Sequence, residues 1–349
     1  MRTRAVINVD GEIVRKIKAK GDAYSSGVIY GNEAKDKILE NVEAYKSLYR
    51  ELGLSWDRVK AKVEEGKEEI RSFDGDAFDF INGISEGSGA SLEDILVINY
   101  RYEFLSSQET SSCTSIGVLG TIQEHKKTII AQTWDFREDF NRLVNLELSI
   151  GKNPKVFTQV EAGLIAHRGM NSEGIGLCIN ALSSKEDTLN LGIPLVSVLP
   201  WAILNLSSIT KALDLIVQAR RGSSINYLLC KDGFVIDAEL TPNYLDFIEP
   251  DEHGIIIHTN HFLHDRLKEK EKRISSSSLT RFLRTKTLVK EMKAKIGVEE
   301  IKTILRDHFD YPSSICRHPG TNASAIINVT DREFLYTIGN PCSSDYTNF

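Results

Sequence analysis

The sequence lacks several features that would each indicate a particular class of protein. No apolar run reaches the roughly 18 residues of a membrane span, and the basic N-terminus has no apolar stretch of signal-peptide length. With 43 Lys and Arg against 49 Asp and Glu, the net charge of −6 leaves no basic excess for binding nucleic acid. We therefore expect a soluble, cytoplasmic protein with neither nucleic acid nor a membrane as its partner.

The common phosphate-binding and hydrolase motifs are also absent. Neither G-x-x-x-x-G-K-[ST] nor G-x-G-x-x-G occurs, which argues against nucleotide hydrolysis. Without G-x-S-x-G or H-E-x-x-H, the usual serine hydrolases and zinc proteases lose support. The five cysteines are odd in number and include no C-x-x-C pair, so we expect free thiols and neither a disulfide framework nor a zinc knuckle.

The segment HTNHFLH is the one place where histidines gather in the sequence. His258, His261 and His264 recur at three-residue spacing directly after an apolar run. Residues three apart on a strand face opposite sides of the sheet, so these side chains should not converge on one ion. We predict no metal site.

The patterns that are present predict an α+β fold. Residues 33–104 carry apolar positions at helical spacing, and Ser91 is an expected N-cap with Asp94 three residues later. Strand patterns follow, with further helices expected at 196–220 and 278–309, and SSSS at 275–278 suggests a solvated loop. The expected strands are 114–120, 128–136, 143–151, 155–165, 174–182, 225–230, 234–240, 254–260, 324–329 and 334–338. Short turns between them imply antiparallel sheets, with helices outside.

Cys113 has an unusual position at the end of a polar segment. The Ser-rich run SSQETSS precedes it, and an apolar strand pattern begins immediately behind it. A buried structural cysteine is the common case, but a thiol at this junction suits a reachable nucleophile. If the next strand forms a hairpin with this one, TWDF brings Asp135 back beside Cys113.

Seven segments in order resemble one family. They are INGISEGSGASLEDILVINYRYEF, CTSIGVLG, AQTWDF, GIGLCINAL, IIIHTNH, DYPSSICR and GNPC. Together they resemble the acyl-CoA:6-aminopenicillanate acyltransferase family (isopenicillin N acyltransferase-like) of cysteine N-terminal-nucleophile (Ntn) hydrolases, over residues 20 to 342. The resemblance implies a four-layer αββα sandwich in a single domain, 1–349, made as an inactive precursor or zymogen.

The resemblance also implies self-cleavage between Ser112 and Cys113, which gives fragments 1–112 and 113–349 that stay together as a heterodimer. The new α-amine of Cys113 has an ordinary pKa near 7.7, so it can serve as the base for its own thiol. Ser112 stands where well-known members carry glycine, which tolerates unusual dihedral angles better.

Other roles carry over by matching motif. Asp135 in TWDF resembles the aspartate that holds the new amine, and Asn260 in HTNH resembles the donor to the oxyanion. Arg317 in SSICR resembles the arginine whose charge favours the thiolate. Asn180 is a candidate second oxyanion or substrate contact. Each has an ordinary structural interpretation as a turn or surface residue.

The substrate prediction is a small acyl amide or acyl thioester. Trp134 and Phe136 are candidates for an acyl pocket, with core packing as the alternative. No cofactor is expected, although coenzyme A is a candidate substrate or acceptor, and the basic run RLKEKEKR at 266–273 is either a contact for its phosphates or a solvated segment.

Three functions therefore remain open. The chain is a self-processing enzyme that transfers an acyl group through a Cys113 thioester to water or another acceptor, a bile-salt-hydrolase-like amidase, or an uncleaved binding module.

Overall fold

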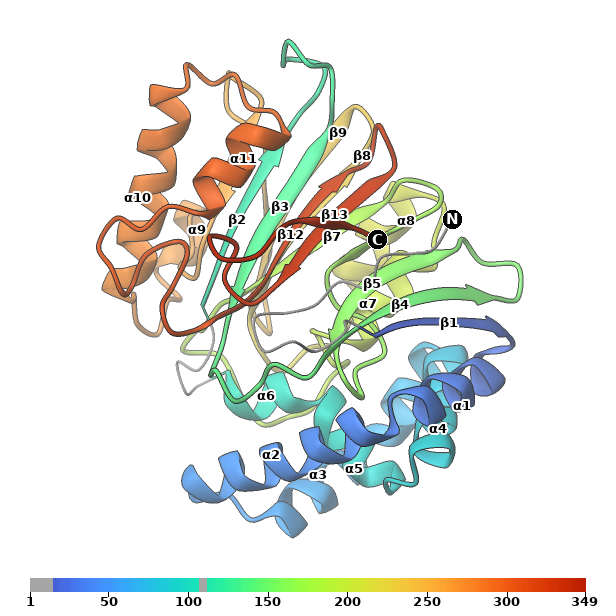
Figure 1. The fold of residues 1–349 in the computed structure, drawn as a ribbon. Coiled ribbons are helices and arrows are strands. Elements are labelled where there is room, and N and C mark those ends of the chain that lie inside the picture. Colours follow the sequence, from blue (N-terminus) through green and yellow to red (C-terminus); the bar gives the residue numbers. More distant parts are fainter. Residues whose placement is uncertain (1–14, 107–111) are drawn as a thin grey trace.

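The computed structural model describes residues 15–106 and 112–349. Most of the polar loop expected before Cys113, residues 107–111, lies outside the described residues. Two β-sheets stack face to face, and helices cover both outer faces (Figure 1). None of the helices in the described ranges combines the length and apolar character needed to cross a bilayer.

The larger sheet has eight strands in the order β1-β4-β5-β6-β7-β8-β9-β10. Their bounds are β1 Lys16–Gly21, β4 Leu143–Ile150, β5 Val156–Glu161, β6 Gly169–Asn171, β7 Gly176–Ala181, β8 Ile225–Lys231, β9 Phe234–Leu240 and β10 Leu245–Ile248. All pairs are antiparallel except β1 with β4, which is parallel. The expected antiparallel sheets are confirmed apart from this edge pair, between whose strands helices α1 to α6 (residues 23–105) and two strands of the other sheet supply the long crossover that parallel pairing needs.

The smaller sheet has six strands in the order β11-β2-β3-β12-β13-β14, and all its pairs are antiparallel. Their bounds are β2 Ser112–Val118, β3 Ile129–Asp135, β11 Ile255–His258, β12 Thr321–Asn328, β13 Glu333–Ile338 and β14 Thr347–Asn348. Strands β2 and β3 contact β7 and β8, so the two sheets share an apolar interior.

The helices form the two outer layers. Their bounds are α1 Ala23–Glu33, α2 Lys35–Glu51, α3 Trp56–Phe73, α4 Gly75–Ser88, α5 Leu92–Asn99, α6 Arg101–Leu105, α7 Val198–Leu204, α8 Ile209–Gln218, α9 Asp265–Lys268, α10 Ser276–Glu291 and α11 Val298–Leu305. α1 and α7 contact the larger sheet, whereas α10 and α11 contact the smaller one (Figure 1). The predicted four-layer αββα sandwich is confirmed. The N-cap at Ser91 is also confirmed, since its hydroxyl accepts the N–H of Asp94 at 3.2 Å.

Helices α1 and α4 touch through their backbones. Gly27 and Gly31 of α1 face Gly83 and Gly87 of α4, at four-residue spacing on both helices. A Cβ added at any of them would lie only 2.2 to 2.6 Å from a carbonyl oxygen of the facing helix. The absence of side chains therefore sets how closely the two helices pack.

Glu103 on α6 is a buried acid beside the sheets. It is 2% exposed, and its Oε1 accepts the N–H of Leu195 at 2.8 Å. Burial raises its pKa to about 8, even though this hydrogen bond and Arg101 favour the charged form. The carboxyl group is therefore largely neutral in the folded protein below that pH.

This burial predicts a specific pH dependence of stability. The unfolded chain ionises Glu103 at its ordinary pKa, so the free energy of unfolding should fall as pH rises from about 4.5 to about 8. The full difference corresponds to about 5 kcal/mol. In Glu103→Gln the amide oxygen still accepts from Leu195 but the side chain never ionises, so its stability should fall less steeply and exceed the parent's at pH 8.

Urea unfolding at several pH values measures this slope. All variants are compared in one Cys113→Ala background, and the exposed Glu252→Gln is the matched control, whose curve should run parallel to the parent's. Equal slopes for Glu103→Gln and the parent would contradict the assignment to Glu103.

Candidate active site

Strands β2 and β3 place Cys113 beside Asp135. Ser112 pairs with Asp135 and Cys113 with Trp134 in an antiparallel register. The predicted hairpin is thus confirmed. Ser112 is not among the described residues with positive φ, so this strand backbone accommodates a residue other than glycine.

The two faces of β2 have different surroundings. The face of Cys113 also carries Ser115 and Gly117, where Ser115 accepts a hydrogen bond from Asn180 of the larger sheet. Cys113 is 2% exposed and points between the sheets. The opposite face carries Ser112, which contacts Arg317 of the loop before β12, and Thr114, which contacts Arg281 of the outer helix α10.

Asn260 holds the backbone of the candidate nucleophile. The backbone N–H of Cys113 donates to Asn260 Oδ1 at 2.8 Å, and Arg281 Nη2 donates to the same oxygen at 2.9 Å. Both partners can only donate, which fixes the amide so that Nδ2 faces the carbonyl of Ala181 at 3.0 Å. Nδ2 carries a second hydrogen, so Asn260 retains a donor for an oxyanion.

Arg281 is a site residue that the sequence did not reveal. Its guanidinium, on α10, donates to the carbonyl oxygen of Cys113 and, at 2.9 Å, to Thr114 Oγ1. Burial lowers its pKa, which interaction with Asp135 and Cys113 opposes. A buried cation therefore binds the peptide group on the C-terminal side of Cys113.

The start of α10 also corrects an expectation. Ser276–Ser278 belong to the helix, and Ser278 is fully buried instead of lying in a solvated loop. Its Oγ accepts the backbone N–H of Asn260 at 2.8 Å and lies 2.8 Å from His261 Nδ1. The polar composition suggested contact with solvent, but Ser278 satisfies buried polar groups of the site.

Asp135 belongs to a hydrogen-bonded chain with Arg317. Thr321 donates to Asp135 Oδ1 at 2.6 Å and accepts the backbone N–H of Arg317 at 2.9 Å. The Arg317 side chain donates to Ser112 Oγ at 2.9 Å. Burial raises the pKa of Asp135 to about 6, although Arg281, Thr321 and Arg317 favour its charged form. Asp135 and Arg317 thus flank the Ser112 side of the candidate cleavage site.

Asn180 lies deeper between the sheets. Its Nδ2 donates to Ser115 Oγ at 2.7 Å and lies 3.3 Å from His258 Nδ1, while Gln132 donates to its Oδ1. These contacts fall two residues along β2 from Cys113, on the same face. They support the strand that carries the nucleophile.

Trp134 and Phe136 lie in the main hydrophobic core. Their rings stack with centroids 6.0 Å apart and an interplanar angle of 15°. The guanidinium of Arg168 lies 5.4 Å from the Trp134 ring. Burial lowers the pKa of Arg168 to about 10, opposed by interaction with Cys113 and other groups. Arg168 is thus a second unpredicted cation whose charge favours a thiolate at Cys113.

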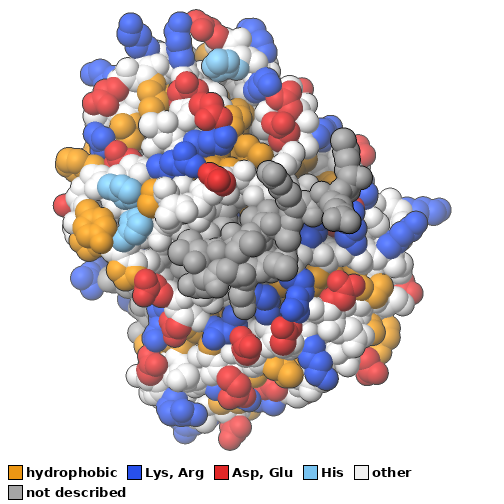
Figure 2. All heavy atoms as spheres, viewed as in Figure 1, with side chains coloured by type: hydrophobic (Ala, Val, Ile, Leu, Met, Phe, Trp, Pro, Cys, Tyr) orange, Lys and Arg blue, Asp and Glu red, His pale blue; other side chains and the backbone are white. Residues whose placement is uncertain are grey.

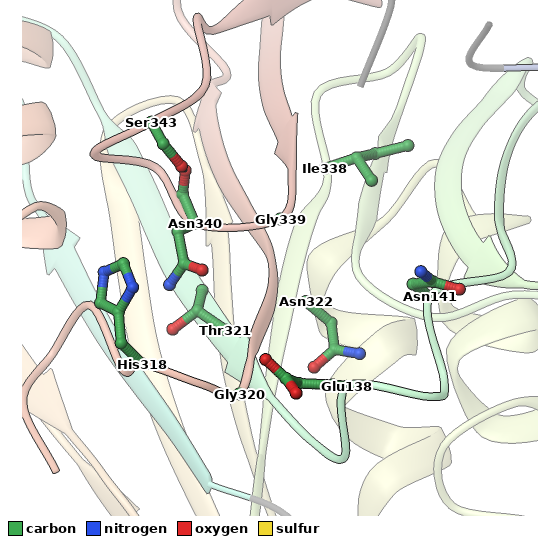
Figure 3. Close-up of a pocket in the computed structure, with 10 residues that line it drawn as sticks. All are labelled: Glu138, Asn141, His318, Gly320, Thr321, Asn322, Ile338, Gly339, Asn340 and Ser343. Carbon is green, nitrogen blue, oxygen red and sulfur yellow. The ribbon is translucent and has the colours of Figure 1, made fainter. Parts of the chain in front are cut away.

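A polar cleft of about 570 Å³ opens at the Asp135 end of the site (Figure 3). Thr321, which holds Asp135, lines it, and the side chains of Asn322 and Glu138 lie on the opposite side from His318. The register between β3 and β12 shifts next to Asn322. The Asn322 side chain accepts the backbone N–H of Phe136 and donates to the carbonyl oxygen of Phe140, so it holds the loop that follows β3. Phe136 lines a neighbouring hollow of about 350 Å³.

The three spaced histidines do not converge. His258 Nε2 lies 2.8 Å from Glu239, His261 contacts Ser278, and His264 faces Asp246 at 3.5 Å. Although burial opposes the charged form, Asp237 and Glu239 raise the pKa of His258 to about 9.

The basic run at 266–273 is largely paired with acids. Arg266 lies 3.2 Å from Asp246, and Lys270 lies 3.2 Å from Glu186. These contacts agree with the solvated-segment interpretation of the run.

A buried cysteine thus stands at the start of an inner strand of the four-layer sandwich, and comparison with known proteins assigns the chain to the acyltransferase and amidohydrolase class of enzymes. The family model for acyl-coenzyme A:6-aminopenicillanic acid acyl-transferase matches residues 122–341, well over half of the chain. The chain belongs to this family.

A curated relative and two solved structures are similar to the chain. The acyl-coenzyme A:6-aminopenicillanic-acid-acyltransferase 40 kDa form of Emericella nidulans is 23% identical over 340 residues, which cover 94% of this chain and 88% of the relative. Penicillin V acylase from Agrobacterium tumefaciens matches with 12% identity and a TM-score of 0.43, over 65% of this chain and 83% of that one. A mutant of the conjugated bile acid hydrolase from Clostridium perfringens matches with 13% identity and a TM-score of 0.43, over 68% of this chain and 96% of that one. The names of the matched family and of the curated relative refer to transfer of an acyl group between coenzyme A and 6-aminopenicillanic acid.

Proposed function

We propose that the chain cuts itself between Ser112 and Cys113 and then cleaves a linear amide through a Cys113 thioester. The observation that carries the proposal is the immobilised Cys113 backbone, whose N–H is bound by Asn260 and whose carbonyl oxygen is bound by Arg281. The peptide groups on both sides of the thiol are thereby held in place. A positioned nucleophile needs this pre-organisation.

Self-cleavage proceeds by an N-to-S acyl shift. The thiol of Cys113 attacks the carbonyl carbon of Ser112, the C–N bond breaks, and the thiol proton goes to the departing nitrogen. Water then hydrolyses the thioester, leaving a carboxylate on Ser112 and a free thiol and α-amine on Cys113. Arg317, bound to Ser112 Oγ, steadies the acyl side of this bond.

In the mature enzyme, the freed amine replaces the histidine of other thiol enzymes. It accepts the thiol proton near neutral pH, and Asn260 Oδ1 and Asp135 hold it in place. The thiolate, favoured by Arg168, attacks the substrate carbonyl, and an Asn260 N–H donates to the oxyanion. The leaving amine takes the proton, and water or an amine or thiol acceptor such as coenzyme A then takes the acyl group. No cofactor enters these steps.

The fragments 1–112 and 113–349 should remain bound to each other. β1 is an edge strand of the larger sheet, and Tyr45 Oη donates to Glu161 at 2.7 Å across the proposed cut. Further hydrogen bonds run from Asn41 to Ala162 and from Asn99 to Gly163. Because these hydrogen bonds are buried, we expect the two fragments to stay together as a stable heterodimer. Five free thiols fit a reducing cytoplasm, which we propose as the location.

Intact mass spectrometry of denatured protein tests the cleavage. We expect two species, one ending at Ser112 and one beginning with Cys113, that co-elute under native conditions. A single full-length species in protein that hydrolyses acyl amides would contradict the proposal, and one without activity would favour a binding module.

A further inference from the structure

Four metal-binding side chains meet at the surface beside the site. His308, Cys316, His318 and Cys342 each offer one nitrogen or sulfur atom, and these atoms all lie within 4.8 Å of one another. It is the one such group of His, Cys, Asp and Glu within residues 15–106 and 112–349. The residues come from the loop after α11, the loop before β12 and the segment after β13.

The separations from His318 Nε2 to the other three atoms fit the edges of a ligand tetrahedron. His318 Nε2 lies 3.2 Å from His308 Nε2, 3.5 Å from Cys316 Sγ and 3.3 Å from Cys342 Sγ. Zn–N bonds of about 2.0–2.1 Å and Zn–S bonds of about 2.3 Å place tetrahedral ligand atoms roughly 3.3–3.8 Å apart. The three measured separations therefore lie at or close to the edges of one coordination tetrahedron.

Hydrogen bonding does not account for this arrangement. The Nε2 of His318 has either one hydrogen or one lone pair, directed in the plane of the ring, so it makes one good hydrogen bond. Three close partners around that nitrogen exceed this capacity. As ligands of one ion, each of the four atoms would instead direct its lone pair at a shared centre.

The surroundings also suit an ion. Asn340 Nδ2 lies 3.6 Å from Cys316 Sγ and donates to the carbonyl oxygen of Arg317 at 2.6 Å, so it supports the sulfur and the loop together. Cys316 is buried, whereas His308 and Cys342 are exposed, which gives an ion a path from solvent. The loop that carries His308 lies at the left of Figure 1, and histidine side chains gather on that side of the surface in Figure 2.

We propose that these four residues form a structural binding site for a borderline-soft divalent cation of the zinc class. Two imidazoles and two thiolates fill all four positions of a tetrahedron, which leaves no open position for a substrate. Arg317 stands between the ligands Cys316 and His318, so the ion would fix the loop from which Arg317 reaches Ser112. Metal binding itself does not depend on the proposed catalytic function.

Cobalt substitution tests the site directly. The purified protein, with both fragments present if it is cut, is kept reduced, stripped with a chelator and titrated with Co²⁺. We expect one equivalent to bind with the visible absorption of tetrahedral Co²⁺ and thiolate-to-cobalt charge transfer, and Zn²⁺ to displace it. Cys342→Ser and His308→Ala should weaken binding by more than the 10- to 100-fold that loss of a supporting residue causes.

Two controls match these variants. Cys113→Ala removes the candidate nucleophile and His253→Ala removes an exposed histidine elsewhere, and both should bind Co²⁺ like the parent. As a second measurement, Zn²⁺ should raise the Tm of the stripped parent but not that of Cys342→Ser, because the ion binds only the folded chain.

Three results would overturn the proposal. They are binding of less than about a tenth of an equivalent by the reduced parent, charge transfer in Cys342→Ser with the same intensity and the same Co²⁺ affinity as in the parent, and a Cys316–Cys342 disulfide that persists under reducing conditions. If one of the variants fails to fold, the Co²⁺ spectrum of the parent still decides whether thiolates bind the ion.

Discussion

Cys113→Ala should yield one uncut chain. Its kcat for acyl-amide hydrolysis should be lower by about 10⁶-fold, the usual effect of removing a nucleophile. The substitution deletes the attacking sulfur for both proposed reactions. Folding should survive, because the thiol is a small buried group whose backbone contacts to Asn260 and Arg281 do not involve the side chain. Denaturing mass spectrometry and steady-state hydrolysis of an acyl amide measure the two effects.

Cys230→Ala is the matched control for this experiment. Cys230 is also fully buried on an inner strand but lies in a separate apolar cluster. This variant should be cut and active. Cys113→Ser retains an attacking atom and should process slowly. Cleavage at the same bond in Cys113→Ala would reveal a different nucleophile.

Asn260→Ala should lower kcat by about 10²- to 10³-fold with a much smaller change in KM, as the loss of one oxyanion donor does. The same substitution removes the acceptor that holds the Cys113 nitrogen, so processing should also slow. Kinetics must therefore be measured on variant protein first shown by mass to begin at Cys113. Near-normal kcat in such protein would exclude the oxyanion role.

Asn82→Ala provides the comparison for Asn260→Ala. Its amide bonds the carbonyl of Phe78 within its own helix at 3.0 Å, in the layer outside the larger sheet. Its loss should leave both processing and kcat unchanged. A comparable fall in the two variants would mean that general destabilisation, and not the site, explains the effect.

The fold was predictable where the local pattern agreed with the tertiary structure. The run 128–136 is rich in β-branched residues and the run 225–230 is mostly apolar, and both are strands. β1 was missed because KIKAKG is half lysine, and only its pairing with β4 makes it a strand. β10 is a four-residue strand with no fully buried position, too short to give a pattern.

The candidate site was predictable only for residues that carry a motif. Arg281 lies 168 residues from Cys113 in the sequence, within a helix whose pattern gives no sign of a buried charge. The cysteine and histidine cluster was missed for the same reason. Its four ligands are spread over residues 308–342, without C-x-x-C, and loops bring them together.

The glycine contact between α1 and α4 reverses an ordinary rule of helix propensity. In an exposed helix interior, alanine is favoured over glycine by about 1 kcal/mol. At Gly27 or Gly83 the same methyl group would meet a carbonyl oxygen of the facing helix at 2.2 to 2.3 Å, so the helices must separate to admit it. The residues that weaken each isolated helix are therefore the ones that specify how the pair docks, and a substitution that improves either helix alone would disfavour the docked layer.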